Sequence, residues 1–546
     1  MKKTPNKEIL RKGKGCNKRI NHIEKEGKMK KYYIVLLTVL FAVGLVFASN
    51  TAAVAAPDKP VRGGTLRCVA RNLSRVLGYP AQFDTVDMIF SLPVLEKLVD
   101  WEKNAVFTPV LAESWEGDPE ALTITWHLRK GVKFHDGTDW NAEALKWNFE
   151  RIIEGRGRPS TDKVKSLEVV DEYTLVMHLS EFNWMMFEDF GFAQMISPTA
   201  FEKAGGGDME KGKQWARMNP VGTGPFKVAE YKRDAYIKYI KNDNYWRQGM
   251  PYLDGIEIHA LPDPMVAAAK LEAGEADMWL GVTDVPNILD LKEKGYKINW
   301  ELGMSTCIIF DSNNPKSIFA NKKVRDAIEY AIDRPAIAKM LGQGLYEPLF
   351  QLARAKSPTY IEGYNPRPYN PEKAKQLLAE AGYHNGFKTT MLALPPSRDA
   401  VSALKSYLGN IGIDVSADVA DFGRYFGSVF GTGFKDMALS VYGNHPDGKE
   451  IFVHFGPNPA TFRTGDIYKS PKFLSLCNEA LSHKYMNAAE AKDKIKEAIK
   501  QAGEDAIAVP LWKTVNVAIM YPYVQSDYYT IHTIIWTPYD DFMEKH

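Results

Sequence analysis

Strand-like and helix-like stretches alternate along most of this 546-residue chain, and the alternation limits the folds that it can adopt. Apolar residues at every second position of 122–128 predict a strand with one buried face. Leu175, Met177 and Leu179 repeat that pattern. Strands interleaved with helices predict layered α/β domains. A chain of this length exceeds one compact domain, so we expect two or three.

Helix boundaries are marked clearly in the second half of the chain. Asp263-Pro264 and Asn370-Pro371 each supply a capping side chain followed by a proline, the combination that favours a helix start. Glycines at 274 and 382 predict where these two helices end. The apolar positions of 324–332 follow helical spacing, which predicts an amphipathic helix with one buried face.

The N-terminal region has the order of an export signal. A pair of lysines precedes an apolar run over residues 32–48, and the small residues Ala53 and Ala55 follow it. We expect cleavage after this run; the alternative is an uncleaved membrane anchor. Translation begins at Met1 or at Met29, and the sequence leaves this open. No later stretch is long and apolar enough to span a bilayer.

The formal net charge of +2 comes from the N-terminal extension. Residues 1–56 hold twelve basic and three acidic side chains, so the remainder is acidic and a nucleic-acid partner is not expected. Cleavage removes Cys16 and leaves Cys68, Cys307 and Cys477. One disulfide can form among these three in an oxidising compartment, and their spacing does not identify it.

Signatures of catalysis are missing from the sequence. It contains no G-x-S-x-G, no phosphate-binding G-K-[ST] and no H-E-x-x-H, which weakens an enzyme assignment. His135 and Asp136 precede a glycine, a pattern more typical of a turn than of a catalytic pair. The histidines at 384, 445 and 454 are the best metal candidates, but their spacing predicts no metal site. We therefore expect neither a metal nor a cofactor.

Seven blocks of the sequence form an ordered series. The blocks are PVLAESWE at 109–116, LRKGVKFHDG at 128–137, NPVGTGPF at 219–226, NDNYW at 242–246, LEAGEAD at 271–277, VRDAIEYAIDR at 324–334 and the segment 369–383. In this order they resemble the bacterial extracellular solute-binding proteins of family 5, the peptide- and nickel-binding partners of ABC importers, and the resemblance runs from the region of residue 61 to about residue 525.

The resemblance implies a two-lobed α/β clamp of the periplasmic-binding-protein type II, with an extra third domain. It also implies a discontinuous division of the chain. The expected parts are an N-terminal extension with signal peptide at 1–56, lobe I at 57–88, 218–302 and 514–546, an extra domain at 89–217 and lobe II at 303–513.

The function implied by the resemblance is capture of a small solute between two lobes, without catalysis, and delivery to the permease of an ABC importer. The solute would be peptide-like, an oligosaccharide or another organic molecule, and the protein would be a periplasmic monomer. In a host without an outer membrane it would be secreted or held at the cell surface. Uptake of a chelated metal such as nickel is the alternative within transport. An exported hydrolase, or a sensory or chaperone-like binder, is the alternative outside it.

Two ligand-contacting residues are implied in lobe II. Peptide-binding members carry a tryptophan and an aspartate that anchor the peptide's α-amino group. Tyr442 stands at the tryptophan position, and the aspartate position holds Asn444 or His445, depending on a one-residue shift. A neutral amide cannot form a charge-assisted bond with an ammonium group, so we expect recognition that does not depend on a free α-amino group.

Three more contacts are implied outside lobe II. The segment from Asn148 resembles the pocket of the nickel-binding branch, where Arg158 falls on a pocket arginine and Gly191 replaces a second one. Tyr79 and Phe83 follow the first strand, in a loop that lines the cleft of relatives. Aromatic walls of this kind suit sugars and planar or apolar groups.

Overall fold

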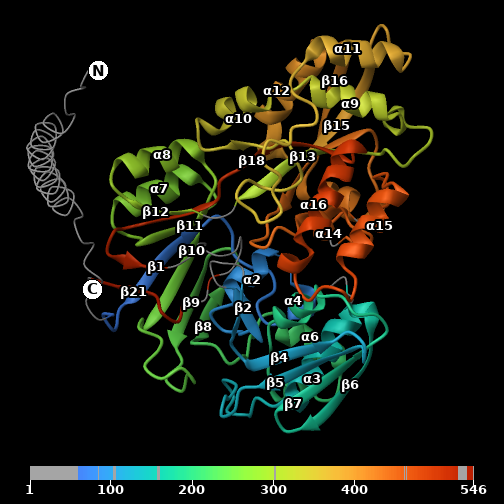
Figure 1. Cartoon of the computed structure of the whole chain (residues 1–546). Helices are drawn as coiled ribbons and strands as arrows, with labels where there is room; N and C mark the ends of the chain where they lie inside the picture. The colour runs from blue at the N-terminus through green and yellow to red at the C-terminus, as the bar shows by residue number, and fades with distance from the viewer. Residues whose placement is uncertain are drawn as a thin grey trace, which may run out of the picture. The chain divides into compact units, whose positions relative to one another are not determined.

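Figure 1 shows the computed structural model of the chain. The residues it describes are 60–83, 85–101, 106–155, 160–300, 303–459, 461–462, 464–526, 536 and 538–544. The predicted export signal and Arg158 lie outside these residues. No helix of the described residues is long and apolar enough to cross a membrane.

The largest sheet collects strands from three separate stretches of the chain (Figure 1). Its order is β12-β19-β11-β1-β10-β9-β8, with β1 parallel to both of its neighbours. Helices α7 (Pro264–Glu272) and α8 (Val285–Glu293) connect strands of this sheet. The strands are β1 (Thr65–Ala70), β8 (Phe226–Lys232), β9 (Tyr236–Lys241), β10 (Gly255–Ala260), β11 (Met278–Val282), β12 (Lys297–Trp300) and β19 (Val517–Met520).

A second sheet has the order β14-β18-β13-β17-β15-β16. Strand β15 is parallel to both β16 and β17, so the carboxyl ends of these three strands lie at one edge of the sheet. Its strands are β13 (Met304–Phe310), β14 (Glu347–Pro348), β15 (Phe387–Ala393), β16 (Ile413–Val419), β17 (Met437–Gly443) and β18 (Ala508–Lys513). The helices of this region are α9 (Lys322–Tyr330), α10 (Arg334–Gly342), α11 (Pro371–Glu380), α12 (Arg398–Gly409), α13 (Phe422–Gly427), α14 (Glu450–Phe455), α15 (Pro471–Ala480) and α16 (Ala488–Glu504).

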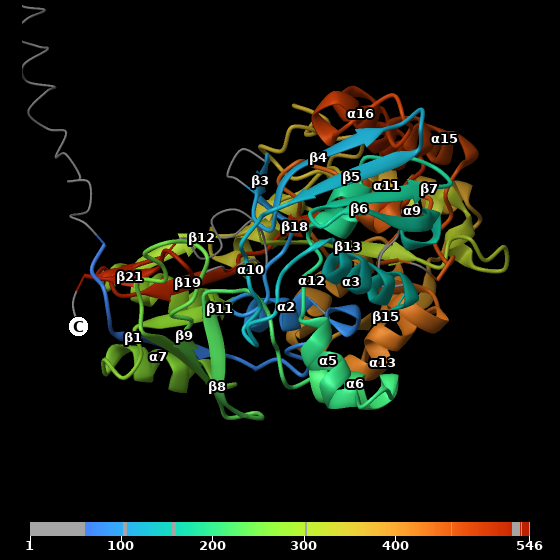
Figure 2. The same ribbon diagram turned by 90° about the horizontal axis from the view of Figure 1, so that it is seen from below.

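A third, antiparallel sheet has the order β4-β5-β7-β6, and helix α3 (Ala142–Gly155) packs against β6 and β7 (Figure 2). The strands are β4 (Ala112–Asp118), β5 (Thr123–Leu128), β6 (Val164–Asp171) and β7 (Thr174–Leu179). Nearby in the chain are α2 (Thr85–Ser91), β2 (Val99–Trp101), β3 (Phe107–Pro109), α4 (Met186–Gly191), α5 (Pro198–Gly205) and α6 (Met209–Ala216). The chain ends with β20 (Val524–Gln525) and β21 (Phe542–Met543). The predicted α/β class is confirmed, whereas the domain boundaries stay a prediction.

The predicted helix starts are confirmed by their caps. The carboxylate of Asp263 accepts a hydrogen bond of 2.8 Å from the backbone N–H of Met265, and the amide oxygen of Asn370 accepts one of 2.9 Å from Lys373. Both helices end beside a glycine with positive φ, as expected. The predicted strand 122–128 begins one residue later, because Leu122 adopts φ +56° in the preceding turn.

The segment containing His135 and Asp136 is a turn, as predicted. The chain reverses at Gly137, which has φ +88°. Asp136 accepts a hydrogen bond of 2.5 Å from the hydroxyl of Ser197, and His135 Nε2 donates to the carbonyl of Gly224 over 2.9 Å. Because their polar atoms bind the framework, these side chains have a structural role here.

The three cysteines that remain after the predicted cleavage are free and buried. Cys68 lies in β1, Cys307 in β13 and Cys477 in α15. Burial raises the pKa of the Cys477 thiol to about 12, which suppresses the reactive thiolate. No disulfide joins any two of these three residues, although the sequence alone allowed one.

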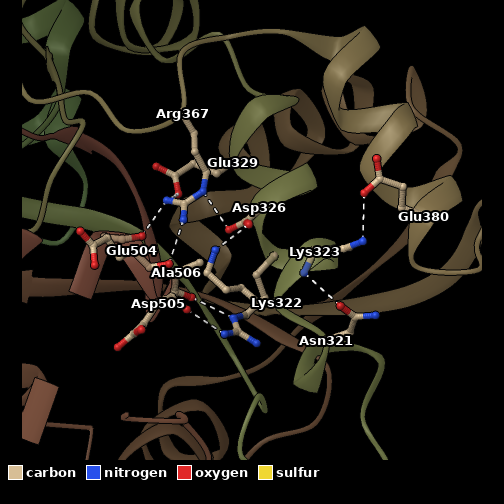
Figure 3. A network of polar contacts seen from close by, with 12 residues as sticks. Asn321, Lys322, Lys323, Asp326, Glu329, Arg367, Glu380, Glu504, Asp505 and Ala506 are labelled. Atoms are coloured by element: carbon tan, nitrogen blue, oxygen red, sulfur yellow. Dashed lines mark hydrogen bonds and ion pairs between the residues drawn. The ribbon is translucent and has the colours of Figure 1, made fainter. Parts of the chain in front are cut away.

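An ion network fixes helix α9 to the end of α16 (Figure 3). The guanidinium of Arg367 contacts Asp326 over 2.8 Å and Glu329 over 3.0 Å, and it also donates to the carbonyl of Glu504. Arg325 donates to the carbonyl of Asp505 over 2.7 Å. These charged groups are mostly buried, and each finds partners inside the protein. We call this set the Arg367 network.

The chain passes between the two larger sheets at two neighbouring places, which we call the crossings. One runs from β12 of the first sheet to β13 of the second, and the other runs from β18 of the second sheet to β19 of the first. The crossings touch where the N–H of Thr514 donates to the carbonyl of Met304 over 2.8 Å. Gly303 is required there, because a Cβ would lie 2.0 Å from the carbonyl oxygen of Thr514.

Candidate functional site

Ionisable side chains gather just beyond the carboxyl end of β17. The segment from His445 to Glu450 joins this strand to α14 and carries four ionisable groups, of which His445 is half-buried and the other three are buried. Ligand sites of α/β proteins favour this position, because the carboxyl ends of the strands open onto the cleft. Figure 1 shows β13 and α14 of this region and, from an earlier part of the chain, α4.

The local backbone is held by specific side chains. Asn444 accepts a hydrogen bond of 2.7 Å from the hydroxyl of Ser305 and donates one of 2.8 Å to the carbonyl of Gly303, which ties the end of β17 to β13. Gly448 has φ +77°, and a Cβ there would lie 2.3 Å from the hydroxyl oxygen of Thr359. The turn before α14 is therefore fixed from two sides.

Lys449 is the centre of the site. Its ammonium group, with the side chain 1% exposed, forms ion pairs with Glu188 of α4 and, over 3.2 Å, with Asp447. The same nitrogen lies 5.3 Å from the ring centre of Trp101 and 5.9 Å from that of Trp184. Carboxylates and aromatic faces both attract a cation, so Lys449 joins the β17–α14 segment to the earlier part of the chain.

Arg354 and Glu450 extend the cluster. Arg354 Nε lies 3.9 Å from a carboxylate oxygen of Glu450, and that oxygen accepts a hydrogen bond of 3.1 Å from the backbone N–H of His445. We call Glu188, Arg354, His445, Asp447, Lys449 and Glu450 the Lys449 cluster. With His445 neutral, three carboxylates face two cations, so the cluster holds one acidic group in excess.

Hydrogen-bonding capacity in the Lys449 cluster is incompletely used. Among the described residues, Arg354 Nε, Asp447 Oδ1 and Glu450 Oε2 are buried and have no hydrogen-bond partner. Buried polar atoms are normally paired, because an unpaired one costs roughly 1–3 kcal/mol. A concentration of such atoms indicates a place where a bound molecule supplies the missing partners.

Burial shifts the protonation equilibria of the cluster. Loss of water raises the pKa of Asp447 to about 8 and that of Glu450 to about 6. Burial also lowers the pKa of Lys449 to about 7 and that of His445 to about 4. Shifts of this kind concentrate at functional sites, because a charge that is costly without a ligand is stabilised by a complementary one.

His454, one of the metal candidates in the sequence, has a structural role. Its Nε2 donates to the carbonyl of Gly443 over 2.9 Å, and its Nδ1 accepts from the hydroxyl of Thr461 over 2.8 Å. Burial lowers the pKa of this imidazole to about 3. Among the described residues, no group of three or more histidine, cysteine, aspartate or glutamate side chains is arranged to hold a metal ion.

The structure places the predicted contacts in two groups. Tyr442 and Asn444 lie at the end of β17, where the Tyr442 ring packs 5.2 Å from that of His454. Tyr79 packs 5.9 Å from Phe201, and it lies with Phe83 in the core beside the seven-stranded sheet. Asn444 is engaged by the framework, and the role of all these residues as ligand contacts stays a prediction.

Sequence reasoning missed every member of the Lys449 cluster except His445. Asp447, Lys449, Glu450, Arg354 and Glu188 were not among the residues predicted to contact a ligand. The first three lie among four ionisable residues within six positions, directly after a buried strand. A dense group of charges at the carboxyl end of an apolar strand is a signal that could have identified them. Glu188 offered a weaker signal, as an acid in an aromatic-rich stretch.

Comparisons with known proteins identify the family of the chain. Residues 106–461 match the model of the bacterial extracellular solute-binding proteins, family 5. The glutathione-binding protein of Shigella dysenteriae is 32% identical over 420 residues, which cover 74% of this chain and 77% of that protein. Heme-binding protein A of Haemophilus influenzae is 31% identical over 488 residues, covering 80% and 85%.

A solved structure shows the same fold. The periplasmic binding protein DppA of Helicobacter pylori, in complex with the peptide STSA, superposes with a TM-score of 0.78 at 24% identity, covering 89% of this chain and 99% of that one. The predicted two-lobed clamp with a third domain is thereby confirmed as the fold class. The chain therefore belongs to family 5 of the bacterial extracellular solute-binding proteins, the substrate-binding components of ABC importers.

Proposed function

We propose that the Lys449 cluster binds a small, peptide-like solute that carries both an ammonium group and a carboxylate. The proposal rests on one observation: the cluster has one carboxylate more than it has cations, and both its cationic and its anionic groups include buried atoms without a hydrogen-bond partner. Asp447 Oδ1 and Glu450 Oε2 can accept from an ammonium group, and Arg354 Nε can donate to a carboxylate. This revises our expectation that recognition does not depend on a free α-amino group.

The names of the relatives support this ligand class. Glutathione, the ligand in the name of one relative, and the peptide STSA in the solved relative are both peptide-like. Both molecules carry ammonium and carboxylate groups, the charges for which the Lys449 cluster offers partners. Within the described residues nothing favours a metal chelate over such a solute, so uptake of chelated nickel is not the function that we propose.

Capture couples to domain closure in this proposal. In the cluster, Asp447 and Lys449 belong to the β17–α14 segment and Glu188 belongs to the earlier part of the chain. Trp101 and Trp184, from the same earlier part, contact the Lys449 ammonium group. A solute that contacts both groups stabilises the arrangement in which they meet, because it binds the open form less well. The permease then receives the closed, loaded protein, and the solute leaves chemically unchanged.

Export is the second element of the proposal. The N-terminal pattern of basic, apolar and small residues favours translocation and cleavage near Ala55. The mature protein then acts as a monomer in the periplasm, or at the cell surface of a host without an outer membrane. N-terminal sequencing of protein from its native host checks this, and an intact Met29 on membrane-bound protein would contradict it.

Calorimetric titration with glutathione and with Gly-Gly-Gly tests the ligand class. We expect saturable binding of at least one of them by the wild type. Asp447→Asn removes a charge next to the bound ammonium group, so affinity should fall by about 10- to 100-fold, or about 1.4–2.8 kcal/mol. Asp414→Asn, at a carboxylate 56% exposed on β16, is the matched control and should leave affinity unchanged.

Two outcomes would overturn the proposal. One is the failure of every zwitterionic probe to bind to wild-type protein that is shown to be folded. The other is equal affinity of Asp447→Asn and the wild type for a probe that does bind. Sustained chemical turnover of the bound solute would separately overturn the proposal that binding is the whole function.

A further inference from the structure

The turn before helix α4 is joined to two helices of the later chain (Figure 1). Trp184 lies in this turn and is 4% exposed. Its indole Nε1 donates a buried hydrogen bond of 2.9 Å to the carbonyl of Ala480, the last residue of α15. The last carbonyls of a helix have no partner within it, so a donor from outside stabilises the helix end. Trp184 therefore holds α15 through a group that the helix itself does not use.

The ring of Trp184 also contacts α14. It lies 6.3 Å from the ring of Phe452, in an edge-to-face arrangement with an interplanar angle of 72°. The ammonium nitrogen of Lys449, the residue that precedes α14, lies 5.9 Å from the centre of the Trp184 ring. Edge-to-face rings attract each other, and an aromatic face attracts a cation. One side chain thus contacts three groups of the region 449–480.

These partners come from two predicted domains. Trp184 belongs to the stretch 89–217, which we expect to form the extra domain, whereas Phe452 and Ala480 belong to the stretch 303–513, which we expect to form lobe II. Glu188, four residues after Trp184, adds the ion pair with Lys449. Every contact of this set joins one part of the protein to another, so the set needs no solute in order to form.

A partly polar cavity borders this contact. Its volume is about 80 Å³, and its lining includes Lys163 and Asn183 on one side and Asn458 and Asn478 on the other. A cavity of this size and polarity has room for water. Parting of two surfaces costs less where polar groups already face water than inside dry apolar packing. The cavity therefore makes the contact at Trp184 easier to open than a fully dry one.

We propose that Trp184 is a latch between the predicted extra domain and lobe II, which favours the closed arrangement before any solute is captured. It is a positioning residue, because it holds α14 and α15 beside the Lys449 cluster and acts on the solute through them. This inference deepens the proposed function and rests on it for the identity of the solute and for the movement of the domains.

The latch affects both rates of solute exchange. A solute enters only while the latch is open, so a protein that spends more time closed binds more slowly. The latch also closes over the bound solute, so it slows release. Removal of the latch should therefore speed both association and dissociation, whereas removal of a group that only contacts the solute speeds dissociation alone.

The distance between the two parts, measured without any solute, tests the latch directly. Spin labels at Glu116→Cys and Lys388→Cys report this distance, because these side chains are 74% and 89% exposed and belong to the two parts. Cys16→Ser leaves only the three buried native cysteines, which do not compete for the label. Trp184→Phe removes the indole N–H and keeps an aromatic ring. We expect it to raise the fraction of molecules at the longer, open distance by about threefold or more.

Matched variants identify the cause of such a shift. Trp140 is another buried tryptophan, whose Nε1 donates to the carbonyl of Leu111 over 3.1 Å within the predicted extra domain. Trp140→Phe removes the same kind of hydrogen bond, so it should lower thermal stability and leave the measured distance unchanged. Glu188→Gln removes the ion pair with Lys449 and should raise the open fraction as Trp184→Phe does.

Stopped-flow kinetics with glutathione and with Gly-Gly-Gly add a second readout. For a peptide that binds, Trp184→Phe should speed association about threefold and dissociation about tenfold, so that affinity falls about threefold. Trp140→Phe should change neither rate by more than about twofold. Faster dissociation with unchanged association in Trp184→Phe would make this residue a simple solute contact and would overturn the latch.

The latch and the proposed function fail in different ways. An open fraction that stays unchanged in both Trp184→Phe and Glu188→Gln would overturn the latch, even if both peptides bound as proposed. A raised open fraction in both variants would support the latch even if neither peptide bound, and only the proposed solute class would then be overturned.

Discussion

The protein buries two ion clusters of similar size, and they are built differently. In the Arg367 network the guanidinium reaches two carboxylates and backbone carbonyls at the end of α16. In the Lys449 cluster the charges contact one another, and Asp447 and Glu450 each keep an oxygen without a hydrogen-bond partner among the described residues. The Arg367 network has one such atom, Asp326 Oδ1, which faces Arg367 Nε over 2.8 Å, whereas the Lys449 cluster has several.

This difference suits the Arg367 network to stabilising the fold and the Lys449 cluster to the binding that we propose for it. A buried ion pair is tolerated when further hydrogen bonds compensate the lost water, as they do for Arg367. The Lys449 cluster lacks that compensation, and burial shifts the pKa values of Asp447, Lys449 and Glu450 toward their neutral forms. A site of this kind lowers the stability of the empty protein and makes capture of a charged solute favourable.

The largest effect on stability is expected in the Arg367 network. Arg367→Met leaves Glu329, with its side chain 2% exposed, short of one partner and frees the carbonyls that the guanidinium covers. We expect a loss of about 3–5 kcal/mol in the free energy of unfolding, measured by chemical denaturation. A loss below 1 kcal/mol would show that this network is no more stabilising than the Lys449 cluster.

The second-largest effect is expected on the pH dependence of stability, to which the shifted pKa values of the Lys449 cluster contribute. The folded-state pKa of Asp447, about 8, lies above that of an unfolded aspartate, so this carboxyl makes the fold less stable as pH rises from about 4 towards 8. Glu450 acts in the same direction up to about pH 6. His445, with a folded-state pKa of about 4, opposes it between about pH 4 and pH 6.5, and Lys449 opposes it above about pH 7. Asp447→Asn should therefore gain stability relative to the ligand-free wild type, by up to about 1.4 kcal/mol per pH unit.

Denaturation of both proteins between pH 4.5 and pH 7, in steps of about half a unit, measures this difference. Asp414→Asn is again the control, since its carboxylate is exposed and the variant should run parallel to the wild type. A difference that stays constant over the whole range would contradict the raised pKa of Asp447.

A smaller loss is expected at the end of β17. Asn444→Asp removes the donor that binds the carbonyl of Gly303 and sets a carboxylate against that oxygen. We expect a cost of about 1–3 kcal/mol in unfolding free energy, from the unpaired carbonyl and the buried charge. Asn410→Asp, at an exposed position, should change it by less than about 0.5 kcal/mol. Equal effects of the two changes would argue against a framework role for Asn444.

The smallest effect is expected at the rim of the Arg367 network. Lys323 and Glu380 form an ion pair of 2.9 Å, but their side chains are 49% and 39% exposed (Figure 3). Solvent screens such pairs, so Lys323→Ala should cost about 0–1 kcal/mol in thermal or chemical denaturation. A larger loss of unfolding free energy would mean that proximity to the Arg367 network stabilises an ion pair even when its side chains are exposed.

Local structure was predictable because its causes are local. Asp263 and Asn370 cap the helices that follow them directly, and the alternation of apolar residues in β5 and β7 shows which face is buried. The ordered sequence blocks gave the family and, through it, the fold class.

The Lys449 cluster was not predictable in the same way. Glu188 and Lys449 are far apart in the chain, and only packing of α4 against the β17–α14 segment joins them. Its unusual protonation comes from burial, which sequence does not display. Asn444 was assigned to the ligand from its position in the resemblance; in the structure its amide both accepts from Ser305 and donates to Gly303.

The strand order of the largest sheet has a consequence for the timing of synthesis. Strand β19 lies between β11 and β12 and is the only partner of β12 in that sheet among the described strands. A ribosome makes β19 only after almost all of the chain, so this sheet stays incomplete until synthesis is nearly finished.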